Sequence, residues 1–113
     1  DVQKVELIQE MNQKVNELNI SVRQLRISGT ARAEAERDYK IALRIEALKL
    51  RDSGIAVSMI DKVVYGVKEI AELRFKRDVA DTVYQANLEA INSIKLQIRI
   101  LENQISREWG ISK

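Results

Sequence analysis

Apolar residues recur at alternating steps of three and four near both ends of the chain. The first series is Ile8, Met11, Val15, Leu18, Val22 and Leu25, and the second is Ile91, Ile94, Ile98, Leu101 and Ile105. A repeat of about 3.5 residues is typical of a coiled coil, in which a narrow apolar stripe is buried against another helix. The spacing therefore predicts helices at both ends that pack through these stripes.

Two short segments interrupt the helical pattern. Ser28-Gly29-Thr30 places a glycine after the first stripe, followed by a threonine that can cap the next helix. Asp52-Ser53-Gly54 is followed by small and β-branched residues, which disfavour a continuing helix. These breaks predict one helix over about 2–27 and a second over about 31–51.

The rest of the chain predicts a short helix and a long one. Ser58 can cap a connector helix over about 58–65, and Gly66 permits a bend after it. No glycine or proline interrupts the segment that follows, so one helix is expected over about 67–109. We therefore expect an all-α fold: an elongated antiparallel bundle of three main helices with coiled-coil-like packing, forming a single domain over 1–113.

Composition narrows the chemistry that the chain can perform. The sequence contains no histidine and no cysteine, which excludes Ser-His triads, thiol nucleophiles and the usual zinc sites. Its four glycines are too scattered for a phosphate-binding loop. The chain is therefore expected not to be an enzyme and to bind neither a cofactor nor a metal.

Hydropathy and cysteine content bear on location. No apolar run approaches the roughly 18 residues of a membrane span, and the polar N-terminal segment lacks the apolar core of a signal peptide. The absence of cysteine fits a reducing compartment. We expect a soluble cytoplasmic protein without a membrane partner. The first residue is Asp1 rather than Met, which fits a chain trimmed at its start.

Acidic residues form small clusters in the sequence. Glu34, Glu36 and Asp38 could in principle bind Mg²⁺ or act as acid and base. The favoured interpretation is a solvated helix face, because Glu36 and Lys40 have the stabilising i,i+4 order of an ion pair.

Basic residues line one side of the second predicted helix. They are Arg37, Lys40, Arg44 and Arg51, and a phosphate backbone could follow this row. The nineteen basic residues are nearly balanced by seventeen acidic ones, so charge alone does not indicate nucleic acid. A solvated face whose cations cover apolar neighbours is the favoured interpretation.

The segment from Leu50 to Leu73 approximates a helix-turn-helix. Under this interpretation the contacts to phosphates or bases come from Lys62, Lys68 and Arg74. The stretch before Gly66 is about one residue longer than the usual pattern, and a plain connector that turns the chain back is favoured.

Three polar or aromatic residues interrupt the stripe of the long helix: Arg77, Tyr84 and Asn87. A polar residue at a core position of a coiled coil lowers stability and fixes register or strand number. We therefore expect these residues to specify register or oligomeric state. Arg77 is expected either to reach out of the seam or to pair with an acid on a preceding helix, because an unpaired buried guanidinium is costly.

Several runs of the sequence resemble small uncharacterised helical proteins of phages and prophages of Gram-positive bacteria. These runs are residues 33–44 (AEAERDYKIALR), residues 71–80 (AELRFKRDVA) and residues 107–110 (REWG). The resemblance covers nearly the whole chain and carries no catalytic residues. It implies a bacterial host cell and a context of phage DNA replication, recombination or host takeover.

These observations favour a non-enzymatic interaction protein that binds a protein partner, as yet unknown. We also expect a homodimer or higher homo-oligomer, because the long helix cannot bury its whole seam against two shorter helices. The alternative is a nucleic-acid-binding accessory protein that uses the basic helix face and the helix-turn-helix-like segment.

Overall fold

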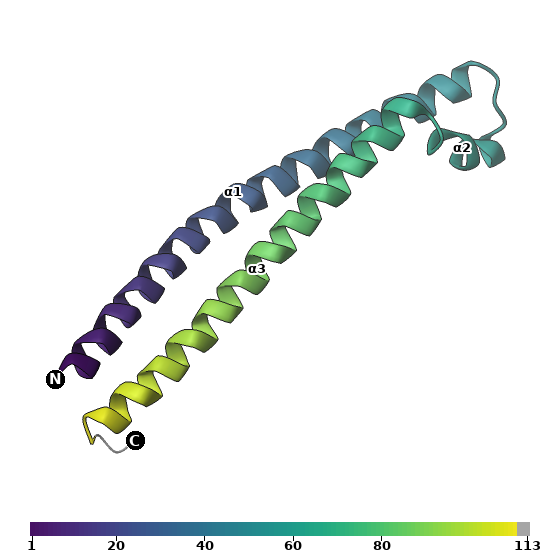
Figure 1. Ribbon diagram of the computed structural model, residues 1–113. Coiled ribbons are helices and arrows are strands. Elements are labelled where there is room, and N and C mark those ends of the chain that lie inside the picture. The colour runs from purple at the N-terminus through teal and green to yellow at the C-terminus, as the bar shows by residue number, and fades with distance from the viewer. Residues whose placement is uncertain (111–113) are drawn as a thin grey trace. The chain divides into compact units, whose positions relative to one another are not determined.

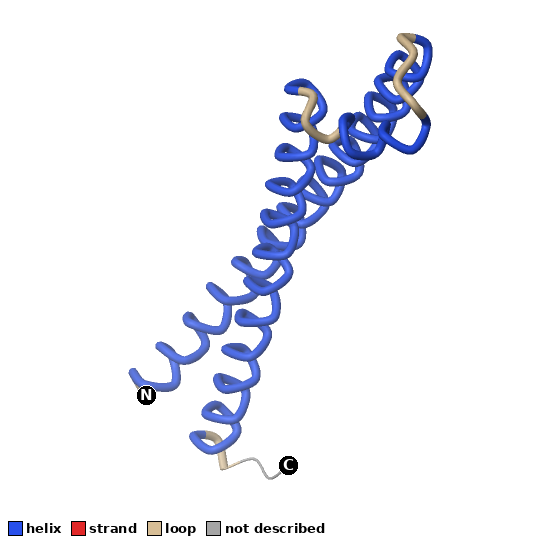
Figure 2. The backbone as a smooth tube through the Cα atoms, turned by 90° about the vertical axis from the view of Figure 1, so that its right-hand side faces the viewer, coloured by secondary structure: helices blue, strands red, loops and turns tan. Residues whose placement is uncertain are grey.

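The computed structural model describes residues 1–110 and contains three helices (Figure 1). Helix α1 spans Val2–Asp52, α2 spans Val57–Val64 and α3 spans Lys68–Glu108. No strand occurs within residues 1–110, and Figure 2 shows helix interrupted only by short loops. The all-α prediction is confirmed.

The predicted break at Ser28-Gly29-Thr30 is wrong, because α1 continues through it without interruption. Gly29 does not adopt the positive φ of a helix-ending glycine. It instead lies against the ring of Tyr84, where a Cβ atom would be 3.4 Å from Cε1. A glycine inside a helix costs only about 1 kcal/mol relative to alanine, so packing on a neighbouring helix outweighs the local preference. The two helices expected over 2–27 and 31–51 are one helix.

The second predicted break is confirmed. Helix α1 ends at Asp52, and Gly54 has a φ of 94°, a conformation that favours glycine. Ser53 Oγ donates a hydrogen bond of 2.8 Å to the Leu50 carbonyl, and the Ile55 amide donates to the same oxygen at 3.1 Å. These bonds satisfy a carbonyl that the helix end would otherwise leave without a donor.

The two following helices begin and end within a residue of the expected positions. Helix α2 spans Val57–Val64 where 58–65 was predicted, and α3 spans Lys68–Glu108 where 67–109 was predicted. The expected cap at Ser58 is wrong, because Ala56 is the N-cap residue and makes no side-chain capping bond.

The chain divides into two compact units, which we call the terminal unit and the middle unit. The terminal unit combines Asp1–Ile27 with the chain from Gln85 onward, and the middle unit is Ser28–Tyr84. Helix segments run antiparallel within each unit. In the terminal unit, Gln3 Nε2 donates to Glu108 Oε1 at 3.2 Å, and Asn87 Nδ2 donates to the Gln24 carbonyl at 3.4 Å.

The seam of the terminal unit follows the predicted stripes in part. Ile91 and Leu101 are buried, and half-buried side chains continue the seam: Met11, Leu18, Val22, Leu25, Ile94, Ile98 and Ile105. Ile8 and Val15 are exposed, while the preceding residues Leu7 and Lys14 are half-buried. The helix thus turns slightly away from the predicted stripe and leaves Ile8 and Val15 at the flank of the seam.

The core of the middle unit forms where all three helices meet. Tyr39 of α1, Val64 of α2 and Ile70 of α3 are each at most 4% exposed and make up one cluster. Partly buried apolar side chains surround it: Ala42, Leu43, Ala47, Leu50, Val67 and Leu73. This cluster fixes α2 against the two long helices and positions the surfaces described next.

Candidate protein-interaction surface

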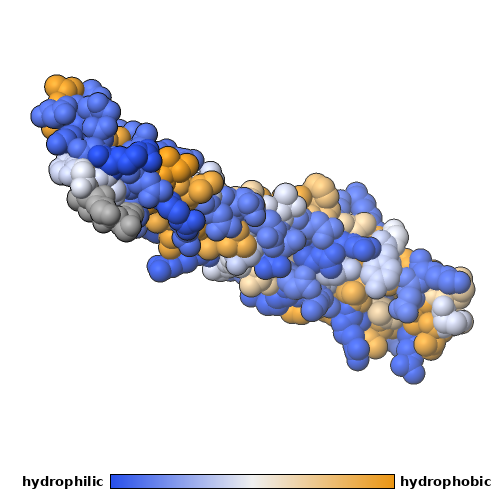
Figure 3. Space-filling view, turned by 90° about the horizontal axis from the view of Figure 1, so that it is seen from below, coloured by the Kyte–Doolittle hydropathy of each residue, from blue (hydrophilic) through white to orange (hydrophobic). Residues whose placement is uncertain are grey.

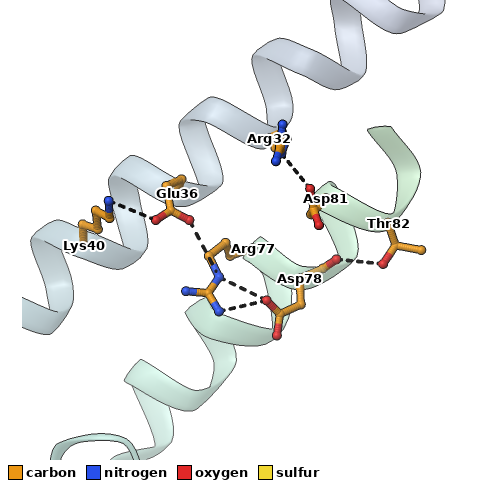
Figure 4. Close-up of polar contacts among 7 residues, drawn as sticks. All are labelled: Arg32, Glu36, Lys40, Arg77, Asp78, Asp81 and Thr82. Atoms are coloured by element: carbon orange, nitrogen blue, oxygen red, sulfur yellow. Dashed lines mark hydrogen bonds and ion pairs between the residues drawn. The ribbon is translucent and has the colours of Figure 1, made fainter. Parts of the chain in front are cut away.

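Arg77 lies on the seam of the middle unit, where α1 and α3 face each other (Figure 4). Its Nη2 atom is 2.9 Å from Asp78 Oδ1, and its Nε atom is 3.7 Å from Glu36 Oε2 on α1. Its guanidinium carbon lies 4.6 Å from the centre of the Tyr39 ring. Of the two arrangements expected for Arg77, the structure shows the pairing with an acid on a preceding helix. The hydrogen bond to Asp78 raises the pKa of Arg77 above its ordinary value, against a smaller opposing effect of desolvation.

A second ion pair joins the same two helices one turn further along. Arg32 Nε lies 2.7 Å from Asp81 Oδ1 (Figure 4). The Arg32 guanidinium also stacks on Tyr84, 4.8 Å from the centre of its ring. Asp81 Oδ1 is shielded from solvent and accepts no well-oriented hydrogen bond, so Arg32 compensates its charge through proximity alone. Both ion pairs cross from α1 to α3, which links the two helices at a defined register.

The two ion pairs border an open groove of about 590 Å³. Its lining residues are Gly29, Arg32, Ala33, Glu36, Arg77, Asp78 and Asp81. Every charged side chain in this lining already has an oppositely charged neighbour within 4 Å, which leaves no unpaired charge to select a ligand. Within residues 1–110, no three acidic side chains come together as a metal site would require. The groove is best explained as the space beside two ion pairs that hold α1 and α3 together.

Tyr84 and Asn87 also face the seam, as predicted from the sequence. Tyr84 is half-buried between Arg32 and Gly29 in the middle unit, and Asn87 is half-buried beside Gln24 in the terminal unit. Their role in register or oligomeric state stays a prediction.

The structure separates the predicted basic residues into three groups. Arg37 Nη2 lies 3.0 Å from Asp38 and Lys40 Nζ lies 3.3 Å from Glu36, so both charges are compensated locally. Arg74 stacks 5.3 Å from the centre of the Tyr65 ring. The others are exposed and have no carboxylate within 4 Å in the described part of the chain: Arg44, Arg51, Lys62 and Lys68.

A small groove separates the end of α1 from α2. Its volume is about 190 Å³, and most of the exposed area of its lining is apolar. The lining residues are Arg44, Ala47, Leu48, Arg51, Val57 and Ile60. Val57 is 70% exposed at its rim, while Ile60 is buried at its base. We call this feature the α1–α2 groove.

Two rows of large apolar side chains point away from the seam of the middle unit. The α1 row is Ile41, Ile45 and Leu48, and the α3 row is Phe75, Val79 and Val83. Each side chain is about half exposed or more, and Phe75 reaches 68%. Apolar side chains also reach the surface between hydrophilic ones in the space-filling view (Figure 3). Steps of three and four place each row on one helix face.

The sequence indicated apolar residues on more than one face of this part of α1, but it did not identify either row as an exposed surface. Helix α1 carries apolar residues on more than one face in this stretch, and spacing alone does not say which face meets α3. The sequence feature that could have revealed the exposed surface is the presence of two apolar faces, because a helix can bury only one of them against a single neighbouring helix.

Trp109 lies at the end of the terminal unit. It is partly exposed, and Lys4 Nζ lies 5.1 Å from the centre of its ring. This contact joins the two ends of the described chain and agrees with a packing role for the indole.

Two further findings bear on function. None of the helices in residues 1–110 combines the length and the apolar character that crossing a bilayer requires. Comparison of the chain with protein-family models, curated proteins and solved structures finds no match.

Proposed function

We propose that this chain is a non-enzymatic helical interaction protein that associates with itself and binds a protein partner. The observation that carries the proposal is the pair of outward apolar rows on α1 and α3 of the middle unit. Contiguous exposed apolar surface bordered by polar residues is typical of protein-interaction sites. The resemblance to phage and prophage proteins suggests a bacterial host cell as the setting.

The exposed area supports association with a further chain. The chain exposes 8232 Å². A folded monomer of 13.0 kDa exposes about 6,300 Å² according to the usual scaling with mass. The two outward apolar rows contribute to this exposed area, and a second copy could cover them.

Sedimentation equilibrium tests the self-association. We expect the native chain to sediment as a dimer or larger species, and Phe75→Ser combined with Val79→Ser to shift it toward the 13.0 kDa monomer. Glu69→Gln changes an exposed side chain of the same helix outside the row and serves as the control. Circular dichroism should show unchanged helicity in both variants. A native chain that stays monomeric at about 100 μM would contradict self-association.

Affinity purification from a lysogenic or infected host tests the partner. We expect one stoichiometric protein to be recovered with the native chain and lost when Ile41 and Ile45 are replaced by serine. Recovery of the same protein by this variant would exclude the α1 row as its binding surface.

A nucleic-acid-binding accessory protein is the second candidate, because Arg44, Arg51 and Lys62 are exposed without acidic partners in the described chain. The start of α3 supports it poorly. Ile70 is buried there, and exposed Glu69 and Glu72 flank it, so a phosphate backbone following Lys68 would meet two carboxylates.

A gel-shift assay between about 50 and 200 mM salt decides between the two candidates. Binding through phosphates should weaken steeply over this range. Replacing Arg37, Lys40 and Arg44 together by alanine should then abolish the complex. Failure of duplex and single-stranded DNA and RNA to bind at 50 mM salt would exclude the second candidate.

A further inference from the structure

We propose that the α1–α2 groove receives an acidic amphipathic helix of a partner protein, with apolar side chains of that helix in the groove and its carboxylates on Arg44 and Arg51. The inference rests on the proposed function and specifies the chemistry of the partner. It names a surface distinct from the α3 row through which self-association is tested.

The size and lining of the groove suit side chains of another protein. Ala47 and Leu48 of α1 and Val57 and Ile60 of α2 supply its apolar surface. Its volume of about 190 Å³ lies below the roughly 300 Å³ at which pockets for small molecules begin. A groove of this kind matches the recognition of an amphipathic helix, which anchors itself by one or two apolar side chains per turn.

The charges beside the groove indicate that the partner is negatively charged. Arg44 and Arg51 both line it, and neither has a carboxylate within 4 Å in residues 1–110. One to two turns earlier on the same helix, Arg37 and Lys40 are each paired with an acid. Uncompensated arginines therefore coincide with the apolar lining, and they are complementary to a helix with acidic edges.

The spacing of the two arginines gives the register of the partner. They are seven residues apart, which places them on one side of α1 at a separation of about 10.5 Å along its axis. A partner helix that lies along α1 would meet both with carboxylates seven residues apart, and the apolar residues between these carboxylates would face Leu48 and Val57.

Contacts within the chain hold the base of the groove and the turn beside it in place. Ile60 at its base is buried, and Val64 one turn later belongs to the core cluster with Tyr39 and Ile70. The Ser53 and Ile55 bonds to the Leu50 carbonyl fix the turn between α1 and α2. A rigid receptor loses little conformational entropy on binding, which favours useful affinity from a small contact.

The apolar lining distinguishes this partner from a nucleic acid. Phosphate contacts need cations, but they gain nothing from Leu48 and Val57 between those cations. Stacking with bases needs accessible aromatic faces, and none of the residues that line the groove is aromatic.

Fluorescence anisotropy with two labelled synthetic peptides tests the proposal on the full chain. The acidic peptide is a helix with leucine at positions i+3 and i+4 between glutamates at i and i+7, repeated twice, and the control peptide replaces every glutamate by lysine. A 20-base-pair DNA duplex is the third probe. We expect the acidic peptide to bind at least about tenfold more tightly than the basic one.

Charge reversal identifies the groove. Arg44→Glu with Arg51→Glu should weaken the acidic peptide by about tenfold or more and strengthen the basic one, whereas Arg37→Glu, on the same helix but outside the lining, should change neither by more than about twofold. Val57→Ser should weaken binding of the acidic peptide without reversing the charge preference.

Four outcomes would each overturn the proposal. They are absence of binding by the acidic peptide, equal binding of both peptides, insensitivity to the double variant, and preferential binding of the duplex. Sedimentation of the same preparations separates this result from the proposed function, because self-association through the α3 row does not depend on Arg44 or Arg51.

Discussion

Replacement of Gly29 by alanine is expected to stabilise the protein. Gly29 lies in the middle of the 51-residue helix α1, and its backbone is not in a conformation reserved for glycine. The sequence suggested the opposite, namely that Gly29 ends a helix. The substitution therefore asks directly whether the chain behaves as one continuous helix at this position.

The expected gain follows from helix propensity and local space. Alanine is favoured over glycine in a helix interior by about 0.8–1.0 kcal/mol. The added Cβ would lie 3.4 Å from Tyr84 Cε1 and 3.7 Å from Cδ1, which is ordinary contact with a flat ring and adds a small apolar burial. We expect the free energy of unfolding to rise by about 1 kcal/mol, equivalent to a few degrees in Tm.

Urea denaturation followed by circular dichroism at 222 nm measures this change. Gly54→Ala is the matched control, because Gly54 has a φ of 94° and open space around it. The control should destabilise the chain by about 1 kcal/mol through backbone strain alone. If Gly29→Ala destabilised the chain by a similar amount, α1 would break at Gly29 and the continuous helix would be wrong.

Three further predictions concern the middle unit. Tyr39→Ala should lower the free energy of unfolding by about 3 kcal/mol in urea titration, because it empties the centre of the core cluster. Tyr39→Phe keeps the ring and should cost less than about 1 kcal/mol. Similar losses from both variants would place the ring outside the core. Asp81→Asn should cost no more than about 1 kcal/mol, because both side chains of its ion pair with Arg32 are nearly half exposed even though the Oδ1 atom is shielded. A loss above about 3 kcal/mol would show that the pair as a whole is desolvated. Because the pKa of Arg77 is raised, its contribution to stability is complete below its ordinary pKa and is lost only as pH rises through the raised value. The difference in Tm between the native chain and Arg77→Met should therefore be constant from about pH 5 to 9. A difference that changes over this range would contradict the assigned cause.

The sequence predicted the helical class and most helix ends because these depend on local signals. The positive φ of Gly54 and the ends of α2 and α3 agree with their turn residues. Gly29 was misread because its environment, the ring of Tyr84, lies 55 residues away in sequence and no local rule contains it. Ser58 was misread as a cap because the fold starts α2 one residue earlier.

The candidate surface was less predictable than the fold. The spacing of Arg37, Lys40, Arg44 and Arg51 correctly placed four cations on one helix, but not which of them are neutralised. Arg37 and Lys40 have acids within reach along α1 itself, whereas the exposure of Arg44 and Arg51 beside an apolar groove depends on where α2 packs. The spacing of residues along one helix does not predict where another helix packs against it.

The distribution of polarity across α3 is the inverse of what an isolated pair of helices needs. Between residues 75 and 84, the side of α3 that faces α1 carries Arg77 and Asp81, while Phe75, Val79 and Val83 face away. The arginines of the inner ion pairs cover the rings of Tyr39 and Tyr84, whereas the outer row leaves three large side chains about half exposed or more, so each forgoes part of the roughly 1.5–3 kcal/mol that full burial would supply. A chain that functions alone would gain stability by exchanging the two faces. Because the ion pairs fix the register of α1 and α3 and the outer row remains available, the arrangement stabilises the fold less than it could and supplies a surface that a further chain can bury.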